Sequence, residues 1–317
     1  ERFQRGSRMC VITGVNGDIG NLVAEHVLAS AGPTEVIVTT RSEETAQAWR
    51  DRGVDARIAS YDDLDALTAA FAGGDRLFMV SGMEAGPKRQ QQHRNAVAAA
   101  TAAGIQHIVH TAFNGTERDE VNSHEVADHK LTERLIQESG ATWNFLRNNQ
   151  YADAMAENQA AMAIVSGQSI GNGGDGRVGF VARDDVAEVA AAILLGAGEP
   201  NTGYDVTGPE ALSYAEVGAL ISELSGAPIT VIDLTDDEMY AMWDSLGVPR
   251  ESTGDFSNSP VPWCSDGMVT FGQMIRAGHL DRVTDVVQRF TGHAPQSLRE
   301  LMVQRQAAWP PVPAAGA

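Results

Sequence analysis

Short apolar runs alternate with longer amphipathic segments from Met9 to Arg147. The runs are continuous and rich in β-branched residues, as expected of strands that are buried on both faces of a sheet. We predict strands at Cys10–Thr13, Glu35–Thr39, Ala56–Ala59, Arg76–Val80, His107–Thr111 and Trp143–Leu146. We predict helices at Asn21–Ser30, Glu43–Asp51, Leu64–Phe71, Lys88–Ala103 and Glu125–Ser139. This alternation favours an α/β fold with a Rossmann-like, doubly wound parallel sheet.

The pattern becomes less regular after residue 150. We expect a helix at Tyr151–Val165, a glycine-rich hairpin at Gly171–Val181, a capped helix at Asp184–Leu195 and a further sheet strand at Gly203–Thr207. From Ser213 onward, short amphipathic segments and one strand, Ile229–Ile232, indicate a smaller, mainly helical lobe over the carboxyl ends of the main sheet. The proline-rich end, from Trp309, is expected to be disordered.

Three glycines at three-residue spacing follow the first predicted strand. Residues 11–20 read Val-Ile-Thr-Gly-Val-Asn-Gly-Asp-Ile-Gly and lead directly into a predicted helix. A turn without Cβ atoms lets backbone N–H groups and the positive end of the helix approach a pyrophosphate. An ordinary strand–helix turn is the alternative, but the position between a strand and a helix favours dinucleotide binding. The residues that we assign to this role are Gly14, Asn16, Gly17, Asp18, Ile19 and Gly20.

The chain is expected to divide into a dinucleotide-binding domain, which contains the glycine motif, and a substrate lobe. Residues 9–150 and 182–208 form the predicted dinucleotide-binding domain, and residues 151–181 and 209–305 form the predicted substrate lobe. Residues 1–8 and 306–317 are expected to be tails.

The end of the second predicted strand bears on the choice of cofactor. It reads Thr39-Thr40-Arg41-Ser42, with no acidic residue before Glu43. An acid at this point binds the ribose hydroxyls of NAD, whereas an arginine meets the 2′-phosphate of NADP. Arg41 and Ser42 therefore favour NADPH, although NADH remains possible and an exposed arginine after a strand is also common. Asp62 is placed to reach the adenine amino group, or alternatively to cap the helix that follows.

Composition narrows the class of protein further. The 317 residues carry a net charge of −19, which argues against a nucleic-acid partner because phosphate binding needs a basic surface. We expect no membrane span and no signal peptide, because no apolar run reaches that length. Cys10 and Cys264 are too few for a disulfide framework and fit a reducing cytoplasm. Two lysines against 21 arginines suggest a GC-rich bacterial genome.

The chain resembles the NmrA-like branch of the atypical short-chain dehydrogenases/reductases, from Met9 to about Met302. Within that branch it is most similar to the type 2 NAD(P)H:quinone oxidoreductases. The segments that carry the resemblance are Thr13-Gly14 to Gly20, Arg41, Tyr61-Asp62, Gln92-His93-Arg94-Asn95, Lys130, Leu146-Arg147-Asn148, Arg183-Asp184-Asp185-Val186-Ala187, Thr207-Gly208 and Phe290 to Pro295.

One position departs from the wider superfamily. Active short-chain dehydrogenases place a tyrosine four residues before the active-site lysine, but Val126 stands there, before Lys130. Ketone reduction forms a basic alkoxide, for which a general acid contributes about 10²–10⁴-fold. Quinone reduction forms a stabilised phenolate and needs this acid much less. Type 2 quinone reductases resemble this chain in lacking the tyrosine.

The resemblance implies roles for further residues. Lys130 would bind the nicotinamide ribose and favour the developing anion, and Thr111 would occupy the site of the catalytic Ser/Thr. Ser81, Gly82, Met83 and Asn148 would lie beside the nicotinamide riboside. The candidate substrate-binding residues are Phe113, Asn114, Tyr151, Met155 and Trp263. Each has a structural alternative: a solvated lysine, a strand end, a turn, or an aromatic core.

We therefore expect an NADPH-dependent reductase of an aromatic quinone that uses neither flavin nor metal. A polycyclic, polyketide-type quinone is favoured, as in similar reductases of anthracycline-type pathways. The alternatives are a flavin-independent monooxygenation, with a partner enzyme of the same pathway, and an NAD(P)-binding redox sensor without turnover. His107 and His110 are read as strand residues and His93 as a packing or capping residue, so no metal site is assigned.

Overall fold

A seven-stranded parallel sheet forms the centre of the computed structural model, which describes residues 8–121, 123–252, 256–261 and 263–313. The strand order is β3-β2-β1-β4-β5-β6-β9. The strands are β1 (Cys10–Ile12), β2 (Val36–Thr40), β3 (Asp55–Ile58), β4 (Arg76–Met79), β5 (His107–Phe113), β6 (Thr142–Asn148) and β9 (Thr202–Val206). The order reverses between β1 and β4, which is where a doubly wound sheet opens a crevice at the carboxyl ends of its strands. The fold class expected from the sequence is confirmed.

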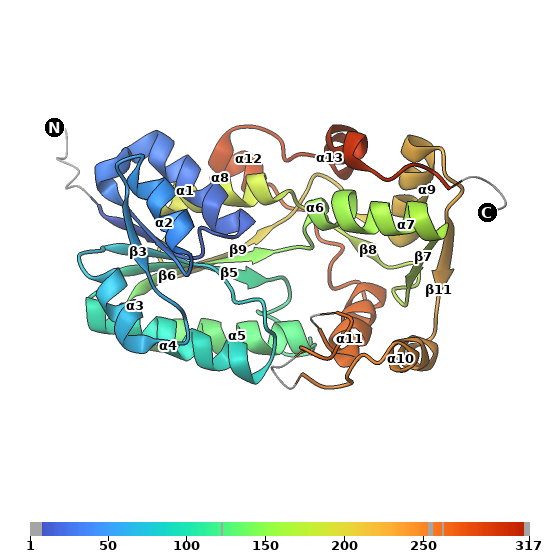
Figure 1. Cartoon of the computed structure of the whole chain (residues 1–317), viewed down its shortest axis with the longest axis horizontal. Helices are drawn as coiled ribbons and strands as arrows, with labels where there is room; N and C mark the ends of the chain where they lie inside the picture. Colours follow the sequence, from blue (N-terminus) through green and yellow to red (C-terminus); the bar gives the residue numbers. More distant parts are fainter. Residues whose placement is uncertain (1–7, 122, 253–255, 262, 314–317) are drawn as a thin grey trace.

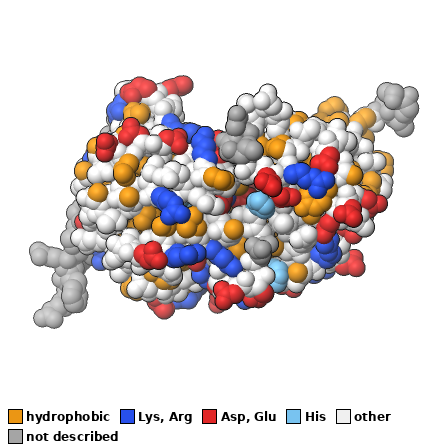
Figure 2. All heavy atoms as spheres, turned by 90° about the horizontal axis from the view of Figure 1, so that it is seen from below, with side chains coloured by type: hydrophobic (Ala, Val, Ile, Leu, Met, Phe, Trp, Pro, Cys, Tyr) orange, Lys and Arg blue, Asp and Glu red, His pale blue; other side chains and the backbone are white. Residues whose placement is uncertain are grey.

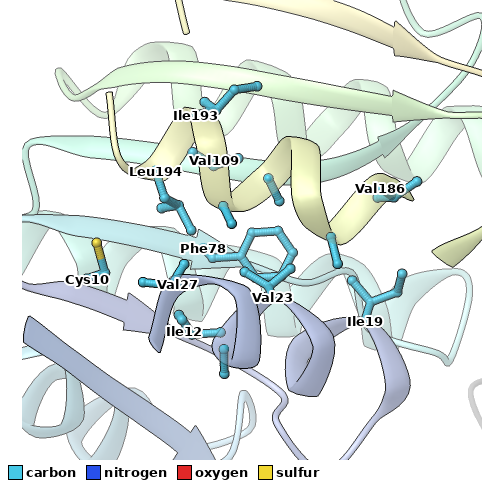
Figure 3. Packing of buried hydrophobic residues seen from close by; sticks show 14 of the residues in the cluster. Cys10, Ile12, Ile19, Val23, Val27, Phe78, Val109, Val186, Ile193 and Leu194 are labelled. Carbon is cyan, nitrogen blue, oxygen red and sulfur yellow. The ribbon is translucent and has the colours of Figure 1, made fainter. Parts of the chain in front are cut away.

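Helices cover both faces of this sheet (Figure 1). One face carries α1 (Asp18–Ala31), α2 (Glu43–Arg50), α8 (Arg183–Leu194) and α12 (Val286–Thr291). The other face carries α3 (Leu64–Phe71), α4 (Pro87–Ala103) and α5 (His124–Glu138). Figure 3 shows the ring of Phe78 between the side chains of α1 and α8. Alternate residues of each central strand enter opposite cores, which explains the continuous apolar runs.

The smaller lobe lies beyond the carboxyl ends of the sheet (Figure 1). Its helices are α6 (Ala152–Ala154), a π-helix (Met155–Gln159), α7 (Ala160–Ser166), α9 (Tyr214–Ser225), α10 (Asp236–Ser245), α11 (Ser265–Arg276) and α13 (Leu298–Arg305). Two strand pairs complete it: β7 (Gln168–Gly171) is parallel to β11 (Thr230–Asp233), and β8 (Arg177–Val178) is antiparallel to β10 (Leu212–Ser213). Short 3₁₀ helices occur at Pro33–Glu35 and Gln306–Ala308.

The expected hairpin at Gly171–Val181 is wrong. The strands that flank these glycines pair with β11 and β10 and not with each other. Gly176 has a different explanation, because a Cβ on it would lie 2.1 Å from the carbonyl oxygen of Ile275. The glycine therefore lets α11 approach the backbone closely. Helix α8 also differs slightly from expectation, since its first N–H is capped by Asp153 from outside the helix, at 2.8 Å.

The lobe boundaries and the tail also differ in detail from the pattern-based expectation. Within residues 209–305, α12 packs on the sheet side of the molecule, where Val286 and Val287 join the core beneath α8. Trp309, at the start of the proline-rich end, donates its indole N–H to the carbonyl of Ala156 at 2.7 Å. The expected disorder is wrong for this residue, because its indole packs on the lobe core. Residues 1–7 and 314–317 lie outside the described residues.

The surface agrees with the acidic composition. On the face that Figure 2 presents, Lys and Arg side chains are interspersed with Asp and Glu. No helix among the described residues is both long and apolar enough to cross a membrane.

Candidate active site

The glycine turn forms the first wall of the crevice. Gly14 has φ +68°, and the N–H of Gly17 donates to its carbonyl at 2.9 Å. A Cβ on Gly20 would lie 2.4 Å from the same carbonyl oxygen, so this glycine is required for close packing of helix and strand. The N-terminus of α1 has no side-chain cap, which leaves its N–H groups available to an anion.

The other three residues of the turn differ in their surroundings. Ile19 is 7% exposed and packs in the core, so only its backbone can serve a ligand. Asp18 forms an ion pair with Arg183 at 3.1 Å. The Asn16 side chain accepts a long hydrogen bond from Thr40, at 3.5 Å.

Two hydroxyl groups brace the crevice where β1 and β4 separate. Thr13 Oγ1 donates to the carbonyl of Phe78 at 3.0 Å and accepts from the N–H of Val80 at 3.0 Å. The Tyr61 hydroxyl lies 2.7 Å from Thr13 Oγ1 and donates to the carbonyl of Val80 at 3.0 Å. The two strands are thus held in register at the point where a dinucleotide would cross them.

An exposed cation directly follows the end of β2. Arg41 is exposed and forms no ion pair or hydrogen bond within the described part of the chain. Ser42 caps α2 by accepting from the N–H of Thr45 at 3.2 Å. Asp62 is not the cap of α3, because Asp63 holds that position. Asp62 instead accepts from Gln92 Nε2, on α4, at 3.0 Å.

Unpaired polar atoms line the carboxyl ends of three adjacent strands. Ser81 Oγ follows β4, Asn114 Oδ1 follows β5, and Asn148 Oδ1 ends β6; all three are buried without a partner among the described residues. Buried polar atoms are normally hydrogen-bonded, so an unpaired set indicates a ligand or water. The ribose hydroxyls and carboxamide of a nicotinamide riboside match these acceptors and donors. The residues present therefore fit a dinucleotide.

The two candidate catalytic residues are already engaged within the protein. Lys130 Nζ donates to the carbonyls of Arg118 and Val121, the latter at 3.0 Å. A lysine ammonium has three N–H groups, so one remains for a ligand. Thr111 Oγ1 accepts from the N–H of Ser81 at 2.8 Å, which ties the end of β4 to β5. Val126 is fully buried in the lobe core.

A cavity of about 770 Å³ opens beside this edge. It is lined by Met83, Glu84, Ala85, Lys88, Arg89, Glu125, Phe256, Ser257, Trp263 and Met268. Met83 is 87% exposed and Trp263 is 40% exposed, so both offer apolar surface to the cavity. Among the predicted substrate residues, only Trp263 is in this lining.

The remaining substrate candidates lie elsewhere. Phe113 packs against His129 and Phe271, with ring centroids 6.3 and 6.0 Å apart. The Tyr151 hydroxyl accepts from Asn148 Nδ2 at 3.1 Å, and burial raises the pKa of this tyrosine. Met155 is 2% exposed and packs in the lobe core. The expected clamp of Phe113, Tyr151 and Trp263 is not assembled around the cavity.

Three buried histidines lie side by side behind the site. The ring centroids of His93 and His110 are 5.5 Å apart, and those of His110 and His129 are 5.9 Å apart. Burial lowers the pKa of all three, to about 4 for His110. All three are therefore neutral at pH 7 and pack as core residues, although His93 Nε2 also accepts from the backbone N–H of Gly82. The sequence motif containing His93 gave no indication of that contact.

Comparison with known proteins agrees with a dinucleotide-binding fold. A family model described as NAD(P)H-binding matches residues 14–196, more than half of the chain. The chain belongs to the NAD(P)H-binding, NmrA-like family. It is 31% identical over 261 residues to quinone oxidoreductase 2 of Escherichia coli K12, covering 82% of this chain and 90% of the relative. The family resemblance found in the sequence is thereby confirmed.

Further relatives cover nearly the whole chain. The crystal structure of the Escherichia coli NADPH-dependent quinone oxidoreductase with NADPH superimposes with a TM-score of 0.82 at 28% identity, covering 93% of this chain and 99% of the other. The triphenylmethane reductase of Citrobacter sp. with NADP(H) gives a TM-score of 0.78 at 27% identity, covering 94% and 99%. A (4-alkanoyl-5-oxo-2,5-dihydrofuran-3-yl)methyl phosphate reductase of Streptomyces griseus is 27% identical, covering 96% and 100%. The chain itself is therefore an NAD(P)H-dependent oxidoreductase.

Proposed function

We propose that this protein reduces a polycyclic aromatic quinone with NADPH by direct hydride transfer. The observation that carries the proposal is Val126, which is fully buried where a ketone reductase needs its proton donor. A site that retains the lysine but lacks the acid suits a substrate whose reduced oxygen is a stabilised phenolate. The quinone oxidoreductase among the relatives supports the same substrate class.

The cofactor residues follow from the crevice. The pyrophosphate would rest on the turn at Gly14, Gly17 and Gly20, and Arg41 would pair with the 2′-phosphate. Ser81 and Asn148 would then hold the nicotinamide riboside over β4 to β6. When bound there, NADPH supplies the hydride.

The chain's own residues would orient the substrate and stabilise charge. The third N–H of Lys130 is free to bind the ribose, and its positive charge favours an anionic quinone oxygen. Trp263 and Phe256 offer flat apolar surfaces, and Met83 and Met268 adapt to an irregular ring system. The cavity is large enough for a substrate of several fused rings. Proton uptake by the phenolate can come from solvent.

Anaerobic turnover tests this proposal directly. Purified protein, NADPH and either menadione or a hydroxylated anthraquinone should give stoichiometric NADPH oxidation and the dihydroquinone. A ketone of similar size, such as tetralone, should react at least about 100-fold more slowly because no general acid is present. Equal rates with ketone and quinone would refute the mechanism. Tight NADPH binding without any turnover would instead identify a redox sensor.

The fate of oxygen separates two versions of the function. A polycyclic dihydroquinone is electron-rich, so it can react with O₂ without flavin, and a monooxygenase role is our second proposal. Admitting ¹⁸O₂ to the completed anaerobic reaction should then place label in the product, with or without a partner enzyme. Return of the starting quinone with hydrogen peroxide, and no label, would leave a plain quinone reductase.

A further inference from the structure

Side chains of α4 hydrogen-bond to both backbone polar groups of one glycine, Gly82, in the β4–α4 loop. Gly82 receives both of its backbone contacts from α4: its N–H donates to His93 Nε2 at 3.0 Å, and its carbonyl accepts from Arg89 Nε at 2.7 Å. A Cβ on Gly82 would lie 2.9 Å from Gln92 Oε1, so a side chain at this position would displace the end of the Gln92 side chain. The peptide groups on both sides of Gly82 are therefore fixed in one orientation.

Both side chains that hold this glycine are themselves braced on α5. Thr132 Oγ1 donates to the carbonyl of Asp128 at 2.8 Å, so its lone pair must accept from His93 Nδ1, at 2.7 Å. His93 is then the neutral tautomer with a bare Nε2, which is the form that can accept from Gly82. Burial lowers the pKa of His93 and maintains this form at neutral pH.

Arg89 makes the corresponding connection on the carbonyl side. Its side chain is 7% exposed, donates to the Met83 carbonyl at 3.3 Å and pairs with Glu125 at 2.7 Å. Asp128 lies 3.5 Å from the same guanidinium and also accepts from the N–H of Gly86 at 2.6 Å. Residues 82–86 are thus fastened to α5, the helix that carries Lys130.

We propose that His93 and Arg89 are positioning residues that hold residues 81–83 for the nicotinamide half of the cofactor, in register with Lys130. The inference rests on cofactor binding at the crevice and not on the identity of the substrate. The crevice lies between β1 and β4, and Arg41 places the 2′-phosphate on the β2 side. The nicotinamide half must therefore extend across β4 and β5, where Ser81 Oγ is buried and unpaired among the described residues. Fixing Gly82 fixes the direction of Ser81 and of the exposed Met83.

Binding of NADPH and of a fragment that lacks nicotinamide separates positioning from general stability. His93→Phe keeps the aromatic packing against Tyr61 and His110 but removes the acceptor for Gly82. We expect the Kd for NADPH to rise about tenfold, as for one lost hydrogen bond with an unsatisfied donor. The Kd for 2′,5′-ADP, which ends before the loop, should stay within about twofold. His93→Gln restores an acceptor at the Nε2 position and should recover most of the NADPH affinity.

His107→Phe is the matched control. It changes another buried histidine of the same sheet, bonded to Thr142 at the amino end of β5 and remote from the crevice. Its NADPH affinity should equal that of the wild type, and urea unfolding will show whether both variants are folded. Parallel loss of NADPH and 2′,5′-ADP binding in His93→Phe, or equal loss in His107→Phe, would overturn the proposal. So would unchanged NADPH affinity in His93→Phe. Absence of quinone turnover in the wild type would leave these binding results intact.

Discussion

The buried histidine His110 makes the folded state sensitive to acid. Its side chain is completely buried, Nδ1 lies 2.9 Å from the Met79 carbonyl, and Nε2 has no partner among the described residues. Burial lowers the pKa of His110 from its ordinary value of 6.5 to about 4. Between these two pH values, the unfolded chain binds a proton that the folded protein excludes. The free energy of unfolding therefore falls as the pH falls from 6.5 to about 4, and the contribution is fully present above pH 6.5.

The magnitude follows from the same difference. At about 1.4 kcal/mol per pH unit, the gap between 6.5 and about 4 corresponds to about 3 kcal/mol of stability lost at pH 4. This is a large part of the 5–15 kcal/mol that is typical of a folded domain. The pKa values of His93 and His129 are displaced in the same direction, so these two histidines add to the loss of stability in acid.

Replacement of the imidazole tests this reasoning. His110→Asn retains a donor for the Met79 carbonyl but cannot titrate, so the slope of unfolding free energy against pH should fall by up to about 1.4 kcal/mol per pH unit. Urea unfolding at intervals between pH 4.5 and 6.5 measures the slope in both proteins. His107, whose pKa burial also lowers to about 4, provides a second variant, His107→Asn, with the same expected effect. Identical slopes in wild type and both variants would refute the linkage.

Three further predictions concern the cofactor, the active site and the chain end. Arg41→Ala should raise the Kd for NADPH at least about tenfold and leave the Kd for NADH within about twofold, because only NADPH has a 2′-phosphate that pairs with the arginine. Fluorescence titration measures both values, and equal changes would contradict this assignment. Lys130→Met should lower quinone kcat/KM at least about tenfold, and a value within about twofold would exclude a role in the transition state. The same variant should also lower the free energy of unfolding by about 1–3 kcal/mol in urea, because Nζ binds two loop carbonyls. Trp309→Phe should lower that free energy by about 1 kcal/mol through loss of the bond to Ala156, with steady-state turnover unchanged; altered turnover would show that the chain end reaches the site.

The parts of the fold that were predictable depend on neighbours in the sequence. Continuous apolar runs mark strands that are covered on both faces, and the spacing of Gly14, Gly17 and Gly20 marks a turn whose geometry is local. The end of β2 is equally local, and Arg41 directly follows this strand, as the sequence predicts. These features can be predicted without knowing which residues far apart in the sequence come into contact.

The parts that were missed depend on distant partners. β7 pairs with β11, about 60 residues later, so the glycines between β7 and β8 resembled a hairpin. The Trp309 indole hydrogen-bonds to the carbonyl of Ala156, about half of the chain away. The composition of the tail does not indicate this contact. His93 resembled an ordinary helix residue because its partner is a backbone N–H of a loop, which leaves no side-chain pattern to detect. Met155, which the sequence suggests for substrate binding, begins a π-helix and is buried in the lobe core.

The chain crosses several times between the sheet and the smaller lobe, and this path has a consequence for the evolution of the protein. The chain leaves the sheet after β6, builds β7 and β8, returns for α8 and β9, and leaves again before α12 packs on α8. No single cut separates the smaller lobe from the sheet. A new lobe cannot be acquired by simple fusion, and the old one cannot be lost by truncation without exposing the core beneath α8. The cavity beside β4 likewise has walls from both parts of the chain, with Met83 from the β4–α4 loop and Trp263 from the smaller lobe.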